Sequence, residues 1–193
     1  MLPPGREHGA DAATPAITGL VRPHDLREAA PGVFYGCEAF LLADYGTVEF
    51  LKAQARANAL RRARICAHPD PESDQHDMLI ASHHETYVAP HRHRSKSESF
   101  LVIEGEADIL LFEPDGRLAN RFLMGPAGSR HPFFYRMPAG RYHSLDIHSE
   151  LLVFAESTKG PFRPEDTQNA PWAPAPQDIA AGRAFIAALR RKE

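Results

Sequence analysis

Four residues in the middle of the chain have the types and the spacing of a metal site. His91 and His93 are separated by one residue, so on an extended strand both imidazoles point to the same face. Glu98 follows after a short polar loop, and His143 follows a Pro-Ala-Gly turn much farther along the chain. Imidazole nitrogens and a carboxylate oxygen suit divalent transition metals such as Fe, Zn, Ni or Mn. We therefore predict one such ion, bound by Glu98 and by the Nε2 atoms of the three histidines.

A group of cationic residues is a candidate for binding an anionic small molecule near that ion. Arg64 ends an arginine-rich stretch and His68 follows it, while Lys159 precedes a Gly-Pro turn. Guanidinium groups pair well with phosphate and carboxylate, so we predict substrate contacts from Arg64, His68 and Lys159. The alternatives are a solvated helix end, a structural histidine and a surface lysine.

Candidates for proton transfer come from the same part of the sequence. Tyr87 lies four residues before His91 and shares its inward face if the strand is unbroken. His68 and Lys159 are the other two catalytic candidates. His83 and His84 are adjacent, so their side chains point to opposite faces of a strand, and we interpret them as ordinary polar strand residues.

The elements that must position these residues are mostly short strands. Apolar runs of β type begin near Met78 and recur to Phe154, with turn residues between them and no helical periodicity. Pro114-Asp115-Gly116 is the clearest hairpin turn. This pattern predicts an all-β fold, an antiparallel sandwich or barrel, over residues 71–160. A strand and a helix capped by Thr47 should occupy residues 33–70, and residues 177–193 should form a C-terminal helix. Residues 1–32 lack periodicity and are predicted to be a flexible lead-in.

Composition restricts the class of partner. A formal charge of −3 argues against nucleic-acid binding, and no apolar run is long enough to cross a bilayer. The N-terminus lacks the apolar segment of a signal peptide, so we expect a cytoplasmic protein. In that compartment Cys37 and Cys66 are interpreted as two small buried hydrophobic residues and not as a disulfide.

The metal-site residues resemble the two sequence motifs of the cupin superfamily. The first motif is matched by His91, His93, Glu98 and Gly105, and the second, Pro-x-Gly-x-x-His, by Pro138, Gly140 and His143. Two positions depart from the family pattern: Glu85 replaces a glycine and Ile147 replaces an asparagine. The resemblance implies a double-stranded β-helix with a bound metal, and barrels of this kind often pair as homodimers.

A narrower resemblance is to the WbuC family of cupin-fold metalloproteins, over roughly residues 33–176. It is carried by Arg61–Arg64 with His68, by Pro90–His93, by Phe100–Gly105, by Lys159–Phe162 and by Ala170–Pro174. Members occur in bacteria, some among genes for surface polysaccharides. The resemblance therefore implies a sugar or a sugar nucleotide as the small-molecule ligand.

Two functions remain open from the sequence. The first is a metalloenzyme, either an isomerase, a lyase or hydrolase, or a dioxygenase. The second is a non-catalytic module that binds or senses a ligand with the metal as its anchor. A titratable side chain beside the open metal positions favours the enzyme, whereas an apolar lumen favours the binding module.

Overall fold

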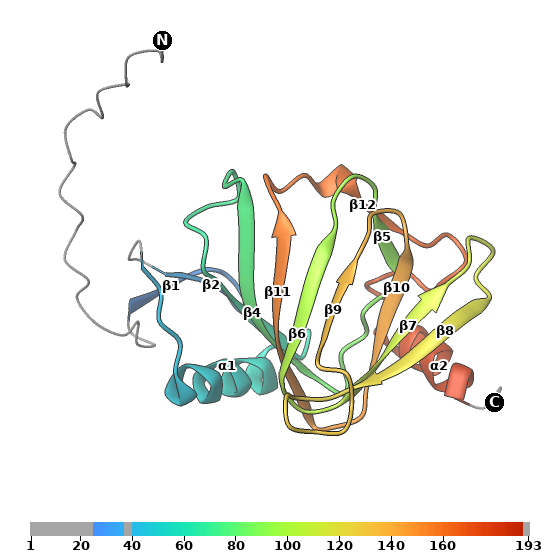
Figure 1. The fold of residues 1–193 in the computed structure, drawn as a ribbon, viewed down its shortest axis with the longest axis horizontal. Helices are drawn as coiled ribbons and strands as arrows, with labels where there is room; N and C mark the ends of the chain where they lie inside the picture. Colours follow the sequence, from blue (N-terminus) through green and yellow to red (C-terminus); the bar gives the residue numbers. More distant parts are fainter. Residues whose placement is uncertain (1–24, 37–39, 191–193) are drawn as a thin grey trace, which may run out of the picture.

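The structure, a computed structural model, describes residues 25–36 and 40–190, and its strands form two sheets (Figure 1). The seven-stranded sheet has the order β1-β2-β3-β4-β11-β6-β9 and the five-stranded sheet has the order β12-β5-β10-β7-β8. The strands of the larger sheet are β1 (Leu26–Ala30), β2 (Val33–Gly36), β3 (Arg62–Cys66), β4 (Gln75–His83), β11 (Leu151–Lys159), β6 (Glu98–Glu104) and β9 (Phe134–Met137). Those of the smaller sheet are β12 (Thr167–Asn169), β5 (His91–His93), β10 (Tyr142–Ile147), β7 (Ala107–Phe112) and β8 (Leu118–Met124).

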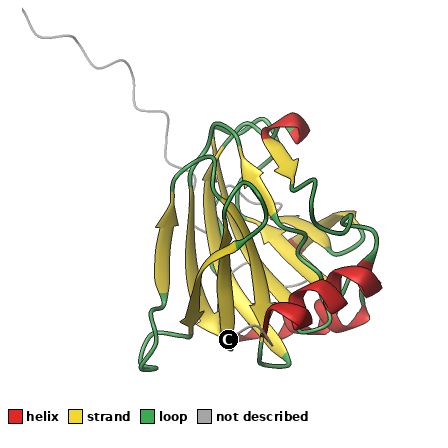
Figure 2. Cartoon of the chain, turned by 90° about the vertical axis from the view of Figure 1, so that its right-hand side faces the viewer, coloured by secondary structure: helices red, strands yellow, loops and turns green. Residues whose placement is uncertain are grey.

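The two sheets enclose an apolar core and form a jelly-roll barrel. From β4 onward, each strand lies in the other sheet from the strand before it, except that β7 and β8 pair with each other at one edge of the smaller sheet. All the pairings among these strands are antiparallel. Residues of both sheets meet in one buried cluster that includes Phe100, Val102, Ile109, Leu145 and Phe154. The predicted double-stranded β-helix with two flanking helices is therefore confirmed, and the helices lie outside the strands (Figure 2).

Helix α1 (Tyr45–Ala57) packs against the outer face of the larger sheet. Its N-cap is Asp44, which accepts a hydrogen bond from the Thr47 backbone N–H at 2.9 Å. The prediction that Thr47 itself caps the helix is therefore wrong, because Thr47 is the third helical residue and completes a capping box. Leu51 and Ala55 are buried against Ile65 of β3, which orients that strand.

The arginine-rich stretch forms strand β3 and is not a helix end. Side chains alternate along β3, so Ala63 and Ile65 face helix α1 while Arg62, Arg64 and Cys66 face the interior of the barrel. The apolar pair is held by α1, and this fixes which face carries the guanidinium groups. Cys66 is buried with a free thiol, and Cys37 lies outside the described residues.

Element boundaries differ in places from those expected. Leu26–Ala30 form β1, although the sequence predicted no regular element before residue 33. Strand β11 extends to Lys159, five residues past its apolar run, because it pairs on both sides with β4 and β6. A 3-10 turn, η2 (Pro164–Asp166), precedes β12. No helix in the described part of the chain is long and apolar enough to span a membrane.

Helix α2 (Ile179–Leu189) closes one end of the smaller sheet. Gly182 lies against the ring of Tyr87, where a Cβ atom would come within 2.2 Å of Cδ1. Arg190, at the end of the helix, forms a bidentate ion pair with the buried Asp146 of β10. Trp172, in the segment before the helix, donates a hydrogen bond to the Pro114 carbonyl at 3.1 Å. These contacts attach the C-terminal segment to the barrel.

Candidate metal centre

Three imidazoles converge inside the barrel, two from β5 and one from β10. His91 pairs directly with His143 across the two strands, and His93 lies two residues farther along β5 on the same face. One ring nitrogen from each of the three histidines lies within 4.8 Å of the others, a spacing that could hold a metal ion. Arg92, between the two β5 histidines, points away and stacks over the Tyr142 ring at 4.7 Å. Strand alternation thus brings the imidazoles together, as predicted.

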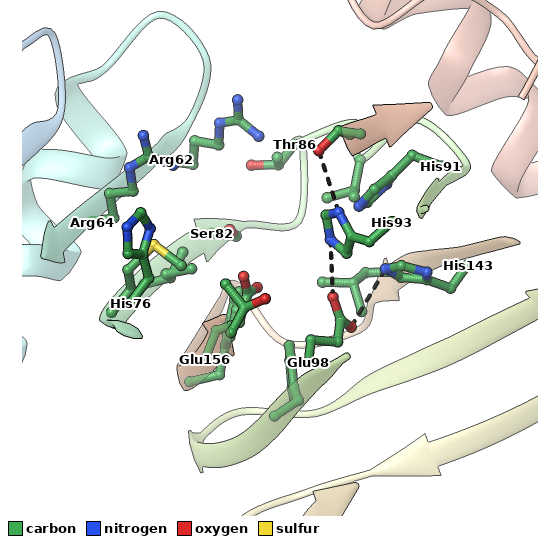
Figure 3. Close-up of a pocket in the computed structure, with 18 of the residues that line it drawn as sticks. Arg62, Arg64, His76, Ser82, Thr86, His91, His93, Glu98, His143 and Glu156 are labelled. Carbon is green, nitrogen blue, oxygen red and sulfur yellow. Dashed lines mark hydrogen bonds and ion pairs between the residues drawn. The ribbon is translucent and has the colours of Figure 1, made fainter. Parts of the chain in front are cut away.

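Glu98 brings a carboxylate to the same point from the opposite sheet. It is the first residue of β6, and its side chain is buried. Its Oε2 atom lies 3.3 Å from His93 Nε2, and its Oε1 atom lies 3.4 Å from His143 Nε2 (Figure 3). The structure therefore gathers all four predicted ligands, with side chains that point toward one another. A mixed set of three nitrogens and one oxygen fits a divalent transition metal and leaves positions for water or substrate.

Backbone contacts direct the outer nitrogens of two imidazoles away from the centre. His91 Nδ1 lies 2.9 Å from the Ala89 carbonyl, and His143 Nδ1 lies 3.0 Å from the Arg141 carbonyl. Each carbonyl accepts a hydrogen bond, so Nδ1 carries the proton and Nε2 is left to face the centre. His93 Nδ1 has the Thr167 hydroxyl at 3.2 Å. This arrangement favours the Nε2 ligation expected from the sequence.

Two glycines of the cupin-like motifs have direct structural roles. Gly140, with φ +87°, turns the chain before β10, and its N–H donates to the His93 carbonyl at 2.7 Å. Gly105, with φ +85°, ends β6, and a Cβ atom there would lie 2.3 Å from the Leu151 carbonyl oxygen. Both positions hold the strands that carry ligands in register.

Glu98 and His143 interact electrostatically. Burial alone would raise the pKa of Glu98, but hydrogen bonds with His143, His93 and Tyr135 hold it well below its usual range. Burial has the opposite effect on an imidazole and lowers the pKa of His143. The hydrogen bond with Glu98 and its negative charge outweigh burial, so the pKa of His143 is raised. Burial and the neighbouring His143 lower the pKa of His91 to about 3. Protonation of His143 therefore competes with metal binding at a higher pH than protonation of His91 does.

A cavity of about 510 Å³ extends from this centre across the barrel. Its floor includes the stacked rings of Phe100, Phe154 and Tyr135. The wall opposite the histidines is formed by β3 and β4, and it carries Arg62, Arg64, His76 and Ser82 (Figure 3). His68, in the loop between these strands, also lines the cavity. A cavity of this size accommodates a small metabolite.

Glu156 lies in this cavity between the two walls and was not among the predicted site residues (Figure 3). Burial and the nearby charge of Glu98 raise the pKa of Glu156 to about 7. Lys96 also lines the cavity and is buried, from the loop before β6. Glu156 lies two residues after Phe154 on β11, so the two side chains point to the same face of the strand. That spacing could have predicted its position, but the apolar run in the sequence ends at Phe154.

Of the residues predicted to bind substrate or transfer protons, some line the cavity and others do not. Arg64 and His68 line the cavity, whereas Lys159 is exposed at the end of β11 and lies outside the lining. Tyr87 borders the cavity, but its hydroxyl donates to the Pro174 carbonyl at 2.9 Å and burial raises its pKa to about 12. Its geometry is therefore that of an anchor for the C-terminal segment, and not that of a proton donor at the centre.

Tyr135 positions Glu98 and offers a test of the centre. Its hydroxyl donates a 2.7 Å hydrogen bond to Glu98 Oε1, and its ring stacks on Phe100 at 5.0 Å. Loss of a hydrogen bond that orients a ligand lowers metal affinity by about 10–100-fold. We expect this loss for Tyr135→Phe, measured by competition with a chelating dye. Tyr45→Phe, at an exposed tyrosine, is the control. Equal affinity in Tyr135→Phe and the wild type would show that Glu98 does not bind the ion.

A second acidic group, Asp108, Asp146 and His148, has the spacing of a metal site but different neighbours. Asp146 is paired with Arg190, and Asp108 lies 3.4 Å from Arg121 Nη1 and 3.0 Å from His148 Nε2. The two arginines neutralise the carboxylates, so the group is better explained as the attachment of helix α2.

Comparisons with known proteins give partial matches. A family model described as a domain of unknown function (DUF6016) matches residues 44–124, and no curated protein matches the chain. Several solved structures are similar to part of the chain. A sugar phosphate isomerase of the cupin superfamily from Silicibacter pomeroyi is 17% identical, with a TM-score of 0.36 over 46% of this chain and 52% of that one.

Two further solved structures are similar over part of their length. The capsular polysaccharide assembling protein CapF from Staphylococcus aureus is 19% identical, with a TM-score of 0.42 over 51% of this chain and 27% of CapF. The 11S globulin procruciferin from Brassica napus is 14% identical, with a TM-score of 0.39 over 49% of this chain and 22% of procruciferin. The match thus spans about a quarter of each of these two longer chains.

Proposed function

We propose that this chain is a metal-dependent enzyme that transfers a proton on a small polar metabolite. His91, His93, Glu98 and His143 would hold the metal, which supplies Lewis-acid chemistry when bound. The reaction class is that of an isomerase or a lyase, since both begin with removal of a proton next to a polarised group. Sugars and sugar nucleotides are the substrates that the family resemblance implies.

The observation that carries the proposal is the carboxyl group of Glu156 inside the cavity. It lies between the histidine wall and the arginine wall, where a ligand in contact with both would pass it (Figure 3). A pKa of about 7 allows Glu156 to accept a proton and return it near neutral pH. In this proposal Glu156 is the general base, and Tyr135 only orients Glu98.

A non-catalytic binding module is the alternative function, and the lining of the cavity decides between the two. A module that only holds a ligand has no use for a carboxyl that titrates near neutral pH inside the cavity. The apolar floor of Phe100 and Phe154 would serve either function, whereas Glu156 favours the enzyme.

Hydrogen–deuterium exchange tests the proposal even when the product is unidentified. Protein loaded in turn with Fe²⁺, Mn²⁺, Ni²⁺ or Zn²⁺ is incubated in D₂O with a panel of sugars, sugar phosphates and hydroxy acids. NMR then detects deuterium at carbon. We expect the wild type to label or convert at least one compound. Glu156→Gln should label it at least about 100-fold more slowly, the usual contribution of a general base.

The metal content of the variant separates the enzyme from the binding module. Glu156→Gln should retain one ion per chain, because Glu156 contacts none of the four proposed ligands. If the wild type binds a compound in the panel but neither labels nor converts it, the binding module is the correct function. If Glu156→Gln labels it as fast as the wild type, Glu156 is not the base.

A further inference from the structure

Two guanidinium groups lie side by side on the wall opposite the metal centre. Arg62 and Arg64 are two residues apart on β3, so both face the cavity. Within the described ranges, neither has a carboxylate in ion-pair distance, and Glu156 reaches them only through longer-range electrostatics. Both side chains are exposed, so they stand at the open side of the cavity, where solvent and a ligand can reach them. Two positive charges placed together without a carboxylate partner indicate an anion that the chain itself does not provide.

His76 adds a buried imidazole to the same wall. Its side chain is only 5% exposed, and its ring stacks on His68, with ring centroids 3.9 Å apart. The Nε2 atom lies against Gly160, where a Cβ atom would come within 2.8 Å of it, so the chain itself covers this nitrogen. The ring therefore supports the wall by packing and leaves the guanidinium groups as the donors that face the cavity.

The number of donors distinguishes between classes of anion. Each guanidinium offers five N–H donors, and a carboxylate can be satisfied by the fork of a single arginine. Two arginines therefore offer more donors and charge than one carboxylate needs, but they match the three terminal oxygens and double charge of a phosphate monoester. Figure 3 shows Arg62, Arg64 and His76 on one side of the cavity and the three histidines on the other.

We propose that Arg62 and Arg64 form a phosphate subsite, and that the substrate is a small phosphate monoester whose other end reaches the metal. The inference about the substrate rests on the proposed function, but the subsite can be tested without it. The phosphate would hold the molecule across the cavity, so that its reacting carbon lies beside Glu156. Arg64, predicted from the sequence to contact an anion, is retained in this role, while Arg62 takes the place expected of Lys159.

Calorimetric titration with inorganic phosphate tests the subsite in protein stripped of metal by a chelator. Because the subsite is on the wall opposite the histidines, we expect saturable phosphate binding without metal. Arg64→Gln and Arg62→Gln should each weaken this binding about tenfold or more, since each removes charge-assisted hydrogen bonds. Arg117→Gln changes the net charge equally at an exposed hairpin residue and should bind phosphate like the wild type. Acetate should bind much more weakly than phosphate.

Three results would overturn the phosphate subsite. They are phosphate binding that requires the metal, equal phosphate affinity in the wild type and both arginine variants, and acetate binding as tight as that of phosphate. Circular dichroism of Arg62→Gln and Arg64→Gln checks that both variants fold. If phosphate binds as expected and the deuterium experiment finds no reaction, the subsite stands and the proposed enzyme does not.

Discussion

His143→Ala should abolish stoichiometric metal binding, with a loss of affinity beyond the roughly 100-fold that removal of an outer hydrogen bond costs. His143 is buried, and its Nε2 atom lies 3.4 Å from Glu98 Oε1, at the junction of the two sheets. The alanine variant would leave ligands from only β5 and β6. Elemental analysis of protein purified without added metal, together with dye competition, measures the change. We expect one ion per chain in the wild type.

His131→Ala is the matched control, because His131 is partly exposed and lies outside the cavity. It should bind metal like the wild type. If His143→Ala retains one ion per chain, the four-residue centre is incorrect. The affinity of the wild type should also fall as pH decreases through the raised pKa of His143, because that imidazole must lose its proton to bind the ion. His91 adds nothing to this fall near neutral pH, since its pKa is about 3.

The fold should survive removal of the metal. The apolar cluster between the sheets, which includes Phe100 and Leu152, makes the barrel without any contribution from an ion. Chelation at neutral pH should therefore leave the circular dichroism spectrum unchanged.

Much of the barrel and the centre could be predicted because local rules determine them. The separation of two residues between His91 and His93 requires a common face on any strand, and the Pro-x-Gly-x-x-His motif marks a turn before a strand. Strand alternation is a property of the chain itself, so tertiary neighbours do not alter it. The apolar runs marked the cores of most strands for the same reason.

The opposite wall could be predicted only in part because tertiary packing determines it. Arg64 and His68 were expected to contact an anion and do line the cavity, but a charged helix end was an equally good interpretation of the arginine-rich stretch. Only the burial of Ala63 and Ile65 under α1 shows that Arg62 and Arg64 face the cavity. Lys159 has a plausible sequence context, yet β11 continues so far that it ends exposed beyond the lining. Glu156 escapes prediction because a charged residue after an apolar run normally marks the end of a strand.

Glu156→Gln should make the metal-free protein more stable at alkaline pH. Burial, followed by the charge of Glu98, raises the pKa of Glu156 from 4.5 to about 7. Between these two values the folded chain binds a proton that the unfolded chain has lost, so the wild type loses stability as pH rises through this range. Glutamine does not ionise. The gain in unfolding free energy should therefore be small at pH 4.5 and reach about 1–3 kcal/mol at pH 8.

Urea unfolding at several pH values measures this difference, with the protein stripped of metal because a bound cation would favour the ionised carboxylate. Glu165→Gln, at an exposed residue of the turn η2, should show no such dependence on pH. A gain for Glu156→Gln that is equal at pH 4.5 and pH 8 would show that burial does not perturb this carboxyl. If the stability gained by Glu156→Gln increases with pH, as expected, then the ionised Glu156 side chain lowers the stability of the wild-type fold. Such a cost is typical of a side chain retained for function and not for folding.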